Sequence, residues 1–266
     1  MTYETDYKFL VRRALECPTR QTRNHPTKAM FGHTLKMDCM EFGIFPILNC
    51  RRMYPKGIVG ELASFLQGAT TIAEFKANGC NYWDKWADKD GNLNLDYGTT
   101  WLNINGVNQL ETVVNSLIDF PTSRRHLIVG YRPDKVAGLS LPSCHYAYQW
   151  FVQDNLLHMI WVQRSVDLMI GLPADMVLAG LFNALMAQSV GLEPGTITMQ
   201  LGDCHIYEDH IPGAQEYVNR GSEPFIDVIP PTWTLDPDAS VFNFEPELFS
   251  IPDYAPMEPI TFELHK

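Results

Sequence analysis

The sequence predicts an α+β fold, with one domain over residues 1–266 and a large mixed β-sheet flanked by helices. Stretches with strand-like alternation and stretches with helical periodicity interleave without a regular βαβ period. No internal repeat, low-complexity tract or linker divides the chain, and 45% of its 266 residues are hydrophobic. A chain of this length and composition can bury one substantial core, so we expect a single domain.

Helices are predicted where apolar residues recur every three or four positions. These stretches are 5–16, 56–67, 71–78, 105–118 and 174–190. Residues that commonly end helices follow three of them: Cys17-Pro18, Asn78-Gly79 and Gly191. In the helix over 105–118, Val107 is expected to face the core together with Leu110, Val113, Val114 and Leu117.

Strands are predicted where apolar and polar residues alternate. These stretches are 29–38, 123–130, 145–153, 156–165 and 196–207. Asp154 and Asn155 separate two of them and are typical of a hairpin turn. The last fifty residues are rich in proline and acidic residues, which predicts extended surface chain without a second packed domain.

Charge and cysteine content exclude several functional classes. The net charge of -11 and the pI near 5.1 argue against direct binding of nucleic acid or an acidic membrane surface. No apolar run reaches the roughly 18 residues of a membrane helix. Six cysteines without a CxxC pair and an N-terminus without a signal peptide predict reduced thiols and a cytoplasmic location. Cys204, His205 and His210 lack the spacing of a closed zinc site, so no metal is expected.

Cys144 is the first candidate for catalysis. It follows a Pro-Ser break and precedes a strand, and Arg164 lies on the next predicted strand. A guanidinium beside a thiol favours the thiolate and lowers its pKa, which would make Cys144 a nucleophile. The alternative is an unreactive, buried cysteine.

Three further residues have two readings each. Glu61 falls near the apolar stripe of its helix, where it is either a misplaced surface residue or a carboxylate with a raised pKa that can move protons. His205 and Tyr207 point to one face of a strand and could bind a sugar hydroxyl, or they could be a satisfied core pair. The chain has no glycine-rich phosphate loop, so arginines would have to hold any phosphate.

Several motifs occur together in one order along the chain. They are Phe31–His33, Glu61–Gly68, Tyr82–Trp86 with Tyr97–Gly98, Ser123–Arg125, Leu141–His145 with Gln149, Gln163–Asp167, Gly171–Pro173, and Gly202–Tyr207 with His210. In this combination the sequence resembles the thymidylate synthase family over most of its length. The resemblance implies the fold of that family and a homodimer in which the sheets of two subunits pack face to face.

The resemblance also implies roles for individual residues. Cys144 would attack C6 of a pyrimidine nucleotide and make C5 nucleophilic toward the co-substrate 5,10-methylenetetrahydrofolate, while Glu61 would order the waters that move protons. Arg23, Arg164 and Ser165 would bind the 5′-phosphate, together with Arg124 and Arg125 donated by the other subunit. His205 and Tyr207 would bind the 3′-hydroxyl, and Gln163 would also bind the substrate. Trp83, Asp167 and Tyr97 would contact the folate or the base, and Arg51 would bind the folate tail.

Asp175 departs from the family pattern, which has asparagine at this position. An asparagine amide donates to O4 and accepts from N3–H of uracil, whereas a carboxylate accepts from the 4-amino group of cytosine and from a protonated N3. The substrate is therefore expected to be dCMP, and Ser165 suits a deoxynucleotide in this family. The alternative is that Asp175 only caps a helix after Pro173.

The C-terminal stretch is a second departure, because it ends in His265-Lys266 where the family has an apolar residue. In synthases the apolar tail shields an exocyclic methylene intermediate from water. A polar tail would admit water, which gives a hydroxymethyl product, as in the branch of the family that modifies deoxycytidylate for bacteriophage DNA. The loop before Phe31 also departs, which leaves Arg20 as a rival of Arg23 for the phosphate.

The sequence therefore predicts a dCMP 5-hydroxymethyltransferase. Its rivals are a dCMP methyltransferase that excludes water, an atypical thymidylate synthase or a dUMP hydroxymethylase. A homologue that binds nucleotide without catalysis is a further alternative from another functional class.

Overall fold

A six-stranded mixed sheet forms the centre of the molecule. The computed structural model describes residues 3–220 and 231–265. The sheet has the strand order β1-β2-β6-β5-β4-β3, in which β5 and β6 are parallel and the other neighbours antiparallel. The strands are β1 (Thr19–Arg20), β2 (Thr27–Met37), β3 (Leu127–Val129), β4 (His145–Gln153), β5 (Leu156–Asp167) and β6 (Glu193–Tyr207). The predicted α+β class and mixed sheet are confirmed.

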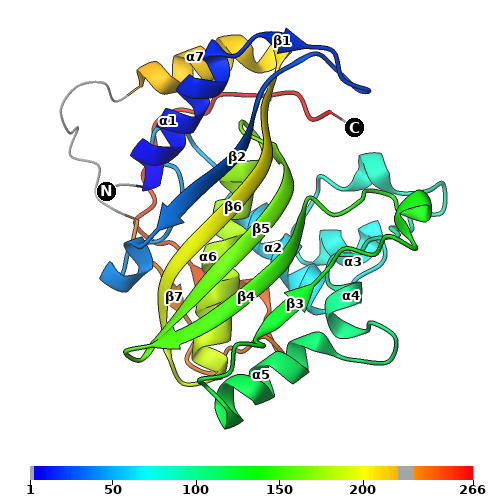
Figure 1. The fold of residues 1–266 in the computed structure, drawn as a ribbon, viewed down its shortest axis with the longest axis vertical. Helices are drawn as coiled ribbons and strands as arrows, with labels where there is room; N and C mark the ends of the chain where they lie inside the picture. The colour runs from blue at the N-terminus through cyan, green and yellow to red at the C-terminus, as the bar shows by residue number, and fades with distance from the viewer. Residues whose placement is uncertain (1–2, 221–230, 266) are drawn as a thin grey trace.

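Helices cover one face of this sheet. They are α1 (Tyr3–Glu16), α2 (Pro55–Leu66), α3 (Ile72–Ala77), α4 (Thr99–Leu102), α5 (Gln109–Asp119), α6 (Gly171–Ser189) and α7 (Ile211–Asn219). The helix α6 connects β5 to β6, and parallel neighbours require such a crossover. In Figure 1, α6 and α2 lie behind the sheet, and the face toward the viewer carries no helix.

The hairpin between β4 and β5 forms as the sequence predicts. Asp154 and Asn155 have φ angles of 52° and 64°, the left-handed conformation that a two-residue type I′ turn requires. Asn and Asp tolerate this conformation better than most residues. The turn fixes the register of the two strands that carry Cys144 and Arg164 at their far end.

The helix predicted over 105–118 begins later than expected. The helix α5 starts at Gln109, because the side chain of Asn108 caps it by accepting a hydrogen bond from the backbone N–H of Glu111. Val107 precedes this cap and is 50% exposed, so its predicted inward position is wrong. The helix α6 differs in the other direction and begins at Gly171, three residues before the predicted start.

The C-terminal fifty residues are extended, as predicted, but they are not confined to the surface. Val241, Phe244 and Phe249 are buried in the main core, and β7 (Thr234–Leu235) pairs with β8 (Phe249–Ser250). The expectation of a purely surface segment is wrong at these positions, because apolar anchors spaced among the prolines hold the chain against the domain. Residues 221–230 lie outside the described part.

Two expectations about the chain concern membranes and cysteines. Among the helices in the described ranges, none combines the length and apolar character needed to cross a membrane. The six cysteines all fall in these ranges, and each carries a free thiol.

Candidate active site

A cavity of about 750 Å³ opens beside the carboxyl ends of β5 and β6. Its volume lies in the range of small-molecule sites. The walls come from α2, the segment Tyr82–Trp86, the loop before β4, the first turns of α6 and the C-terminal segment 260–265. The structure brings together thirteen of the predicted site residues here: Arg23, Arg51, Glu61, Trp83, Tyr97, Cys144, Gln163, Arg164, Ser165, Asp167, Asp175, His205 and Tyr207.

Cys144 lies immediately before β4, in a loop held by two side chains. The hydroxyl of Tyr97 accepts a hydrogen bond from the Cys144 backbone N–H at 2.7 Å. The guanidinium of Arg164 donates to the carbonyl oxygens of Ser143 and Pro142 at 2.8 and 2.9 Å. Arg164 therefore meets the Cys144 loop, as predicted, and braces its backbone.

The Cys144 thiol does not have a lowered pKa in the ligand-free protein. Burial and the charge of Asp175 raise its pKa to about 11, and the opposing effect of Arg164 is smaller. Arg164 lowers the pKa of Cys144, as predicted, but burial and Asp175 outweigh it, so the expected low-pKa thiolate is not present in this state. In the ligand-free protein the protonated thiol is therefore the favoured form at neutral pH.

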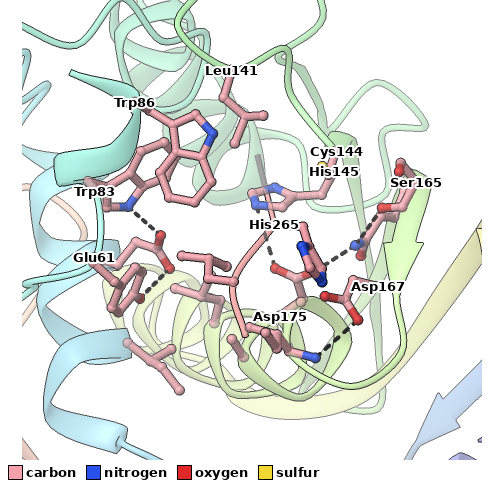
Figure 2. Close-up of a pocket in the computed structure, with 18 of the residues that line it drawn as sticks. Glu61, Trp83, Trp86, Leu141, Cys144, His145, Ser165, Asp167, Asp175 and His265 are labelled. Carbon is pink, nitrogen blue, oxygen red and sulfur yellow. Dashed lines mark hydrogen bonds and ion pairs between the residues drawn. The ribbon is translucent and has the colours of Figure 1, made fainter. Parts of the chain in front are cut away.

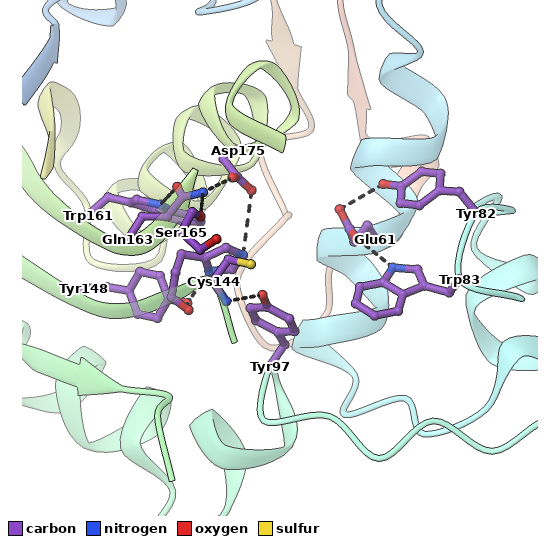
Figure 3. A network of polar contacts seen from close by, with 11 residues as sticks. Glu61, Tyr82, Trp83, Tyr97, Cys144, Tyr148, Trp161, Gln163, Ser165 and Asp175 are labelled. Atoms are coloured by element: carbon purple, nitrogen blue, oxygen red, sulfur yellow. Dashed lines mark hydrogen bonds and ion pairs between the residues drawn. The ribbon is translucent and has the colours of Figure 1, made fainter. Parts of the chain in front are cut away.

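Asp175 lies on α6 and is only 8% exposed. The N-cap of this helix is Ile170, so Asp175 is inside the helix and the capping alternative is wrong. The side-chain amide of Gln163 donates to Oδ2 of Asp175 at 2.6 Å (Figure 3). Burial raises the pKa of Asp175 to about 8, and the charges of Glu61 and Asp167 add to this effect. The raised pKa favours the protonated carboxylic acid at neutral pH.

His145 is a site residue that the sequence reasoning missed. Its Nε2 lies 3.8 Å from Oδ1 of Asp175, and its Nδ1 lies 2.5 Å from the hydroxyl of Tyr148. Burial lowers the pKa of His145 to about 3, so the imidazole is neutral. A β-bulge between His145 and Ala147 allows both His145 and Tyr148 to be buried, and alternation along a regular strand gives no signal for this.

Glu61 is a buried carboxylate on the opposite wall. Its two oxygens accept hydrogen bonds from the hydroxyl of Tyr82 at 2.9 Å and from the indole N–H of Trp83 at 2.7 Å (Figure 3). Burial raises the pKa of Glu61 to about 7, although both hydrogen bonds act in the other direction. Glu61 is therefore not a surface residue, and its raised pKa suits the predicted exchange of protons, which stays a prediction.

His205 and Tyr207 both line the pocket, and their rings are 5.2 Å apart. Nδ1 of His205 lies 3.1 Å from the carboxylate of Asp203. Burial lowers the pKa of His205, but the hydrogen bond to Asp203 and nearby negative charges outweigh it and raise the pKa overall. Arg23 lines the cavity, whereas Arg20 forms an exposed ion pair with Asp203, so the placement favours Arg23 for the phosphate.

Arg51 also lines the pocket and is 4% exposed. It donates to the carbonyl of Met169, and its guanidinium lies 4.9 Å from the centre of the Phe262 ring. Its Nε and Nη1 are buried and have no hydrogen-bond partner. Unpaired guanidinium nitrogens suit a carboxylate, so Arg51 together with Trp83 fits a folate that carries an acidic tail.

Arg124 and Arg125 are not in the pocket of their own chain. Both are exposed and precede β3 at the edge of the sheet.

Asp167 lines the pocket, but its Oδ1 also accepts from the backbone N–H groups of Met169 and Ile170 before α6. Ser165 lines the pocket, and its carbonyl accepts from Gln163.

The C-terminal segment 260–265 closes one side of the cavity, and sequence reasoning did not assign its residues to the site. Ile260, Phe262, Leu264 and His265 line the cavity together with the catalytic candidates (Figure 2). The polar end of the sequence was a signal for this region, but it did not indicate where His265 would bind.

A comparison with protein families agrees with this arrangement. The family described as thymidylate synthase matches residues 5–265, nearly the whole chain. Members of this family are folate-dependent transferases that move a one-carbon unit from methylenetetrahydrofolate to C5 of a pyrimidine nucleotide. The pocket and its candidate nucleophile lie within the matched region. The chain belongs to the thymidylate synthase family.

Proposed function

We propose that the protein transfers a hydroxymethyl group to C5 of dCMP, with methylenetetrahydrofolate as co-substrate and water as the source of the hydroxyl. The observation that carries this proposal is Asp175, a buried carboxylic acid that shares the pocket with Cys144 and is held by Gln163. The product would be 5-hydroxymethyl-dCMP, a precursor of modified phage DNA.

The protonated form of Asp175 complements cytosine. Its O–H can donate to N3, and its carbonyl oxygen can accept from the 4-amino group. The amide of Gln163 on Oδ2 and the neutral His145 near Oδ1 orient the group without adding a positive charge. Protonated Asp175 can therefore bind dCMP whose cytosine N3 is unprotonated. This differs from the expectation from the sequence, in which an Asp175 carboxylate accepts from a protonated N3.

Discrimination against dUMP is then greatest in the transition state. A neutral Asp175 could also donate to O4 of uracil and accept from N3–H, so ground-state binding alone separates the two bases weakly. When Cys144 attacks C6, negative charge moves toward N3 of cytosine or O4 of uracil. N3 of cytosine is the stronger base, so transfer of the Asp175 proton favours dCMP.

Cys144 would start the reaction by forming a bond from Sγ to C6. The Tyr97 hydroxyl holds the backbone of Cys144 in place, and Arg164 holds the loop while its charge favours the thiolate. Glu61, with a pKa of about 7, would move protons through ordered water when C5 loses its hydrogen. The folate would supply the one-carbon unit to C5, and cleavage of the bond between this carbon and the folate nitrogen would release tetrahydrofolate and leave an exocyclic methylene on C5.

Water would complete the reaction. Its oxygen bonds to the methylene carbon, its proton goes to solvent, the C5–C6 double bond forms again and the Cys144 thiolate leaves C6.

Each site would also need Arg124 and Arg125 from the other subunit of a homodimer, because these side chains are exposed and outside the pocket of their own chain.

A second candidate function is methyl transfer to dCMP. The observation in its favour is the segment 260–265, which packs along the cavity and could exclude water. Incubation of the protein with methylenetetrahydrofolate and either dCMP or dUMP, followed by product mass, tests both functions. A product of dCMP plus CH2O supports hydroxymethylation, a product of dCMP plus CH2 supports methylation, and turnover of dUMP alone contradicts the role of Asp175.

A further inference from the structure

The two side chains that support Asp175 are themselves held by buried aromatic residues. The first support is Gln163, whose amide donates to Asp175 and also to the carbonyl of Ser165 at 3.1 Å (Figure 3). Its Oε1 accepts from the indole N–H of Trp161 at 3.2 Å. A flip of the amide would bring oxygen against oxygen and N–H against N–H. An N–H of Gln163 therefore faces Oδ2 of Asp175.

Tyr148 holds the second support, His145. Both residues belong to β4 and are buried. The hydroxyl of Tyr148 lies 2.5 Å from Nδ1 of His145 and 3.3 Å from the carbonyl oxygen of the same residue. The second distance exceeds the ordinary O–H···O range of about 2.5–3.0 Å. The hydroxyl proton of Tyr148 is therefore donated to Nδ1.

This hydrogen bond fixes which nitrogen of His145 carries the ring proton. Burial lowers the pKa of His145 to about 3, so the ring is neutral and has a single N–H. Burial also raises the pKa of Tyr148 well above its ordinary value, so the hydroxyl keeps its proton. Because Nδ1 accepts, the ring proton is on Nε2, the nitrogen that lies 3.8 Å from Oδ1 of Asp175.

N–H groups thus face both oxygens of Asp175. The O–H of protonated Asp175 finds no acceptor on Gln163 or His145 and is directed toward the cavity that Asp175 lines. The contact with His145 must shorten by about 1 Å to become a hydrogen bond, and such contacts often tighten when substrate binds. Once the proton has left, the two N–H groups face a carboxylate and stabilise its charge.

We propose that Tyr148 is a positioning residue that keeps His145 in the Nε2–H form and thereby directs the Asp175 proton toward N3 of the substrate base. The proposal rests on the proposed function, which assigns the transfer of that proton. One proton moves from an oxygen of Asp175 to N3 while the bond from Cys144 to C6 forms, and it returns when that bond breaks. In the other tautomer, the bare Nε2 would accept the Asp175 proton and hold it away from the base.

Nitrogen NMR on the ligand-free protein tests the tautomer directly. With isotope-labelled histidine, the signals of His145 should show a proton on Nε2 and none on Nδ1, and Tyr148→Phe should shift His145 toward the Nδ1–H form. The variant His145→Gln identifies which signals belong to this residue. An Nδ1–H form in the unaltered protein, or the same tautomer in Tyr148→Phe, would overturn the proposal.

Steady-state rates test the consequence for catalysis. Tyr148→Phe should lower kcat for dCMP about 10- to 100-fold, somewhat less than loss of a general acid itself. KM for dCMP should change less than about threefold, because the effect is on proton transfer.

Tyr3→Phe is the matched control for loss of a buried hydroxyl. Tyr3 is fully buried, and its hydroxyl donates to the carbonyls of Phe45 and Ile47 at 3.3 and 2.9 Å. None of these three residues lines the cavity. The control should lose stability without loss of kcat. Equal losses of kcat in the two variants would indicate general damage and contradict the role of Tyr148.

A double-mutant cycle tests whether Tyr148 acts through His145. His145→Gln keeps an amide N–H in the side chain but removes the ring tautomer, so adding Tyr148→Phe should lower kcat by less than about twofold more. A full additional loss would refute the proposal. If the unaltered protein forms no product from dCMP, the proposed function fails, and the NMR result still decides whether Tyr148 controls the tautomer of His145.

Discussion

Asp175 determines the choice of base in this account. Asp175→Asn should lower kcat/KM for dCMP by roughly 10⁴-fold, because the amide cannot give a proton to N3, and it should create turnover of dUMP. Steady-state rates with both nucleotides measure this change, and Asp119→Asn on the exposed end of α5 is the matched control. A variant that kept its preference for dCMP would contradict the role assigned to Asp175.

Cys144 should be unreactive until substrate binds. Its pKa of about 11 means that alkylation by iodoacetamide at pH 7 should be roughly 10- to 100-fold slower than that of a small free thiol, and the rate should rise steadily with pH. Peptide-resolved mass spectrometry separates Cys144 from the other five cysteines. A plateau at or below pH 8 would indicate a preformed thiolate.

Sequence reasoning located most of these residues but not their protonation states. Asp175 and Cys144 were identifiable because a family pattern fixes their positions. Burial raises the pKa of both residues, and the charge of Asp175 also raises that of Cys144, 31 positions away in the sequence; neither effect can be read locally. His145 was missed because the bulge that aims it at Asp175 breaks the alternation used to predict strand faces.

At the scale of elements, a close contact between α2 and the turn before α4 positions Tyr97. Gly98 has a φ of +57°, and a Cβ there would lie 2.1 Å from the carbonyl oxygen of Phe65. Gly98→Ala should therefore destabilise the protein by about 3 kcal/mol or more and reduce activity by moving Tyr97 from Cys144. Chemical denaturation and steady-state rates measure the two effects.

Gly106→Ala is the matched control for this prediction. Gly106 also has a positive φ, +84°, but a Cβ there meets nothing within 4 Å. The control should cost only about 1 kcal/mol, the penalty of the backbone conformation alone. Equal losses in the two variants would show that the contact with Phe65 does not matter.

Most elements could be predicted because their periodicity extends over many residues. The ends of the elements were harder to predict. The helix α5 begins at Gln109 because Asn108 caps it, but the apolar pattern alone also fits a helix that starts earlier and includes Val107. The helix α2 is buried on nearly every side, so the apolar stripe correctly placed Glu61 near the core but gave no information about Tyr82 and Trp83 as its partners.

At the scale of the whole molecule, the uncovered face of the sheet indicates a partner. Four large apolar side chains are exposed on its strands: Phe31, Leu127, Phe151 and Ile160. Strand register places Leu127, Gln149 and Ile160 on one face, opposite the side covered by α6. An apolar surface of this kind is typical of an obligate interface, and Arg124 and Arg125 lie beside it.

Phe151→Asp should convert the proposed dimer to a monomer and abolish activity, since no second subunit would supply Arg124 and Arg125. Sedimentation velocity measures the oligomeric state, and Phe242→Asp, which is exposed outside the sheet, should remain dimeric and active. Mixing inactive Cys144→Ser and Arg125→Ala chains should restore part of the activity through mixed dimers. A fully active monomer would contradict the shared site.

Whether water adds to the exocyclic methylene intermediate was the hardest feature to predict from the sequence. Whether water reaches C5 depends on how residues 260–265 pack against Arg51, His210 and Asp209, which are distant in sequence. A polar tail suggested an open site, whereas the structure has this segment fixed along the cavity with His265 turned inward.

The mass of the product formed from dCMP and methylenetetrahydrofolate tests the central claim most directly. We expect dCMP plus CH2O, no increase in dihydrofolate absorbance, and little product from dUMP under the same conditions. Formation of dCMP plus CH2 with stoichiometric dihydrofolate, or turnover of dUMP alone, would contradict it.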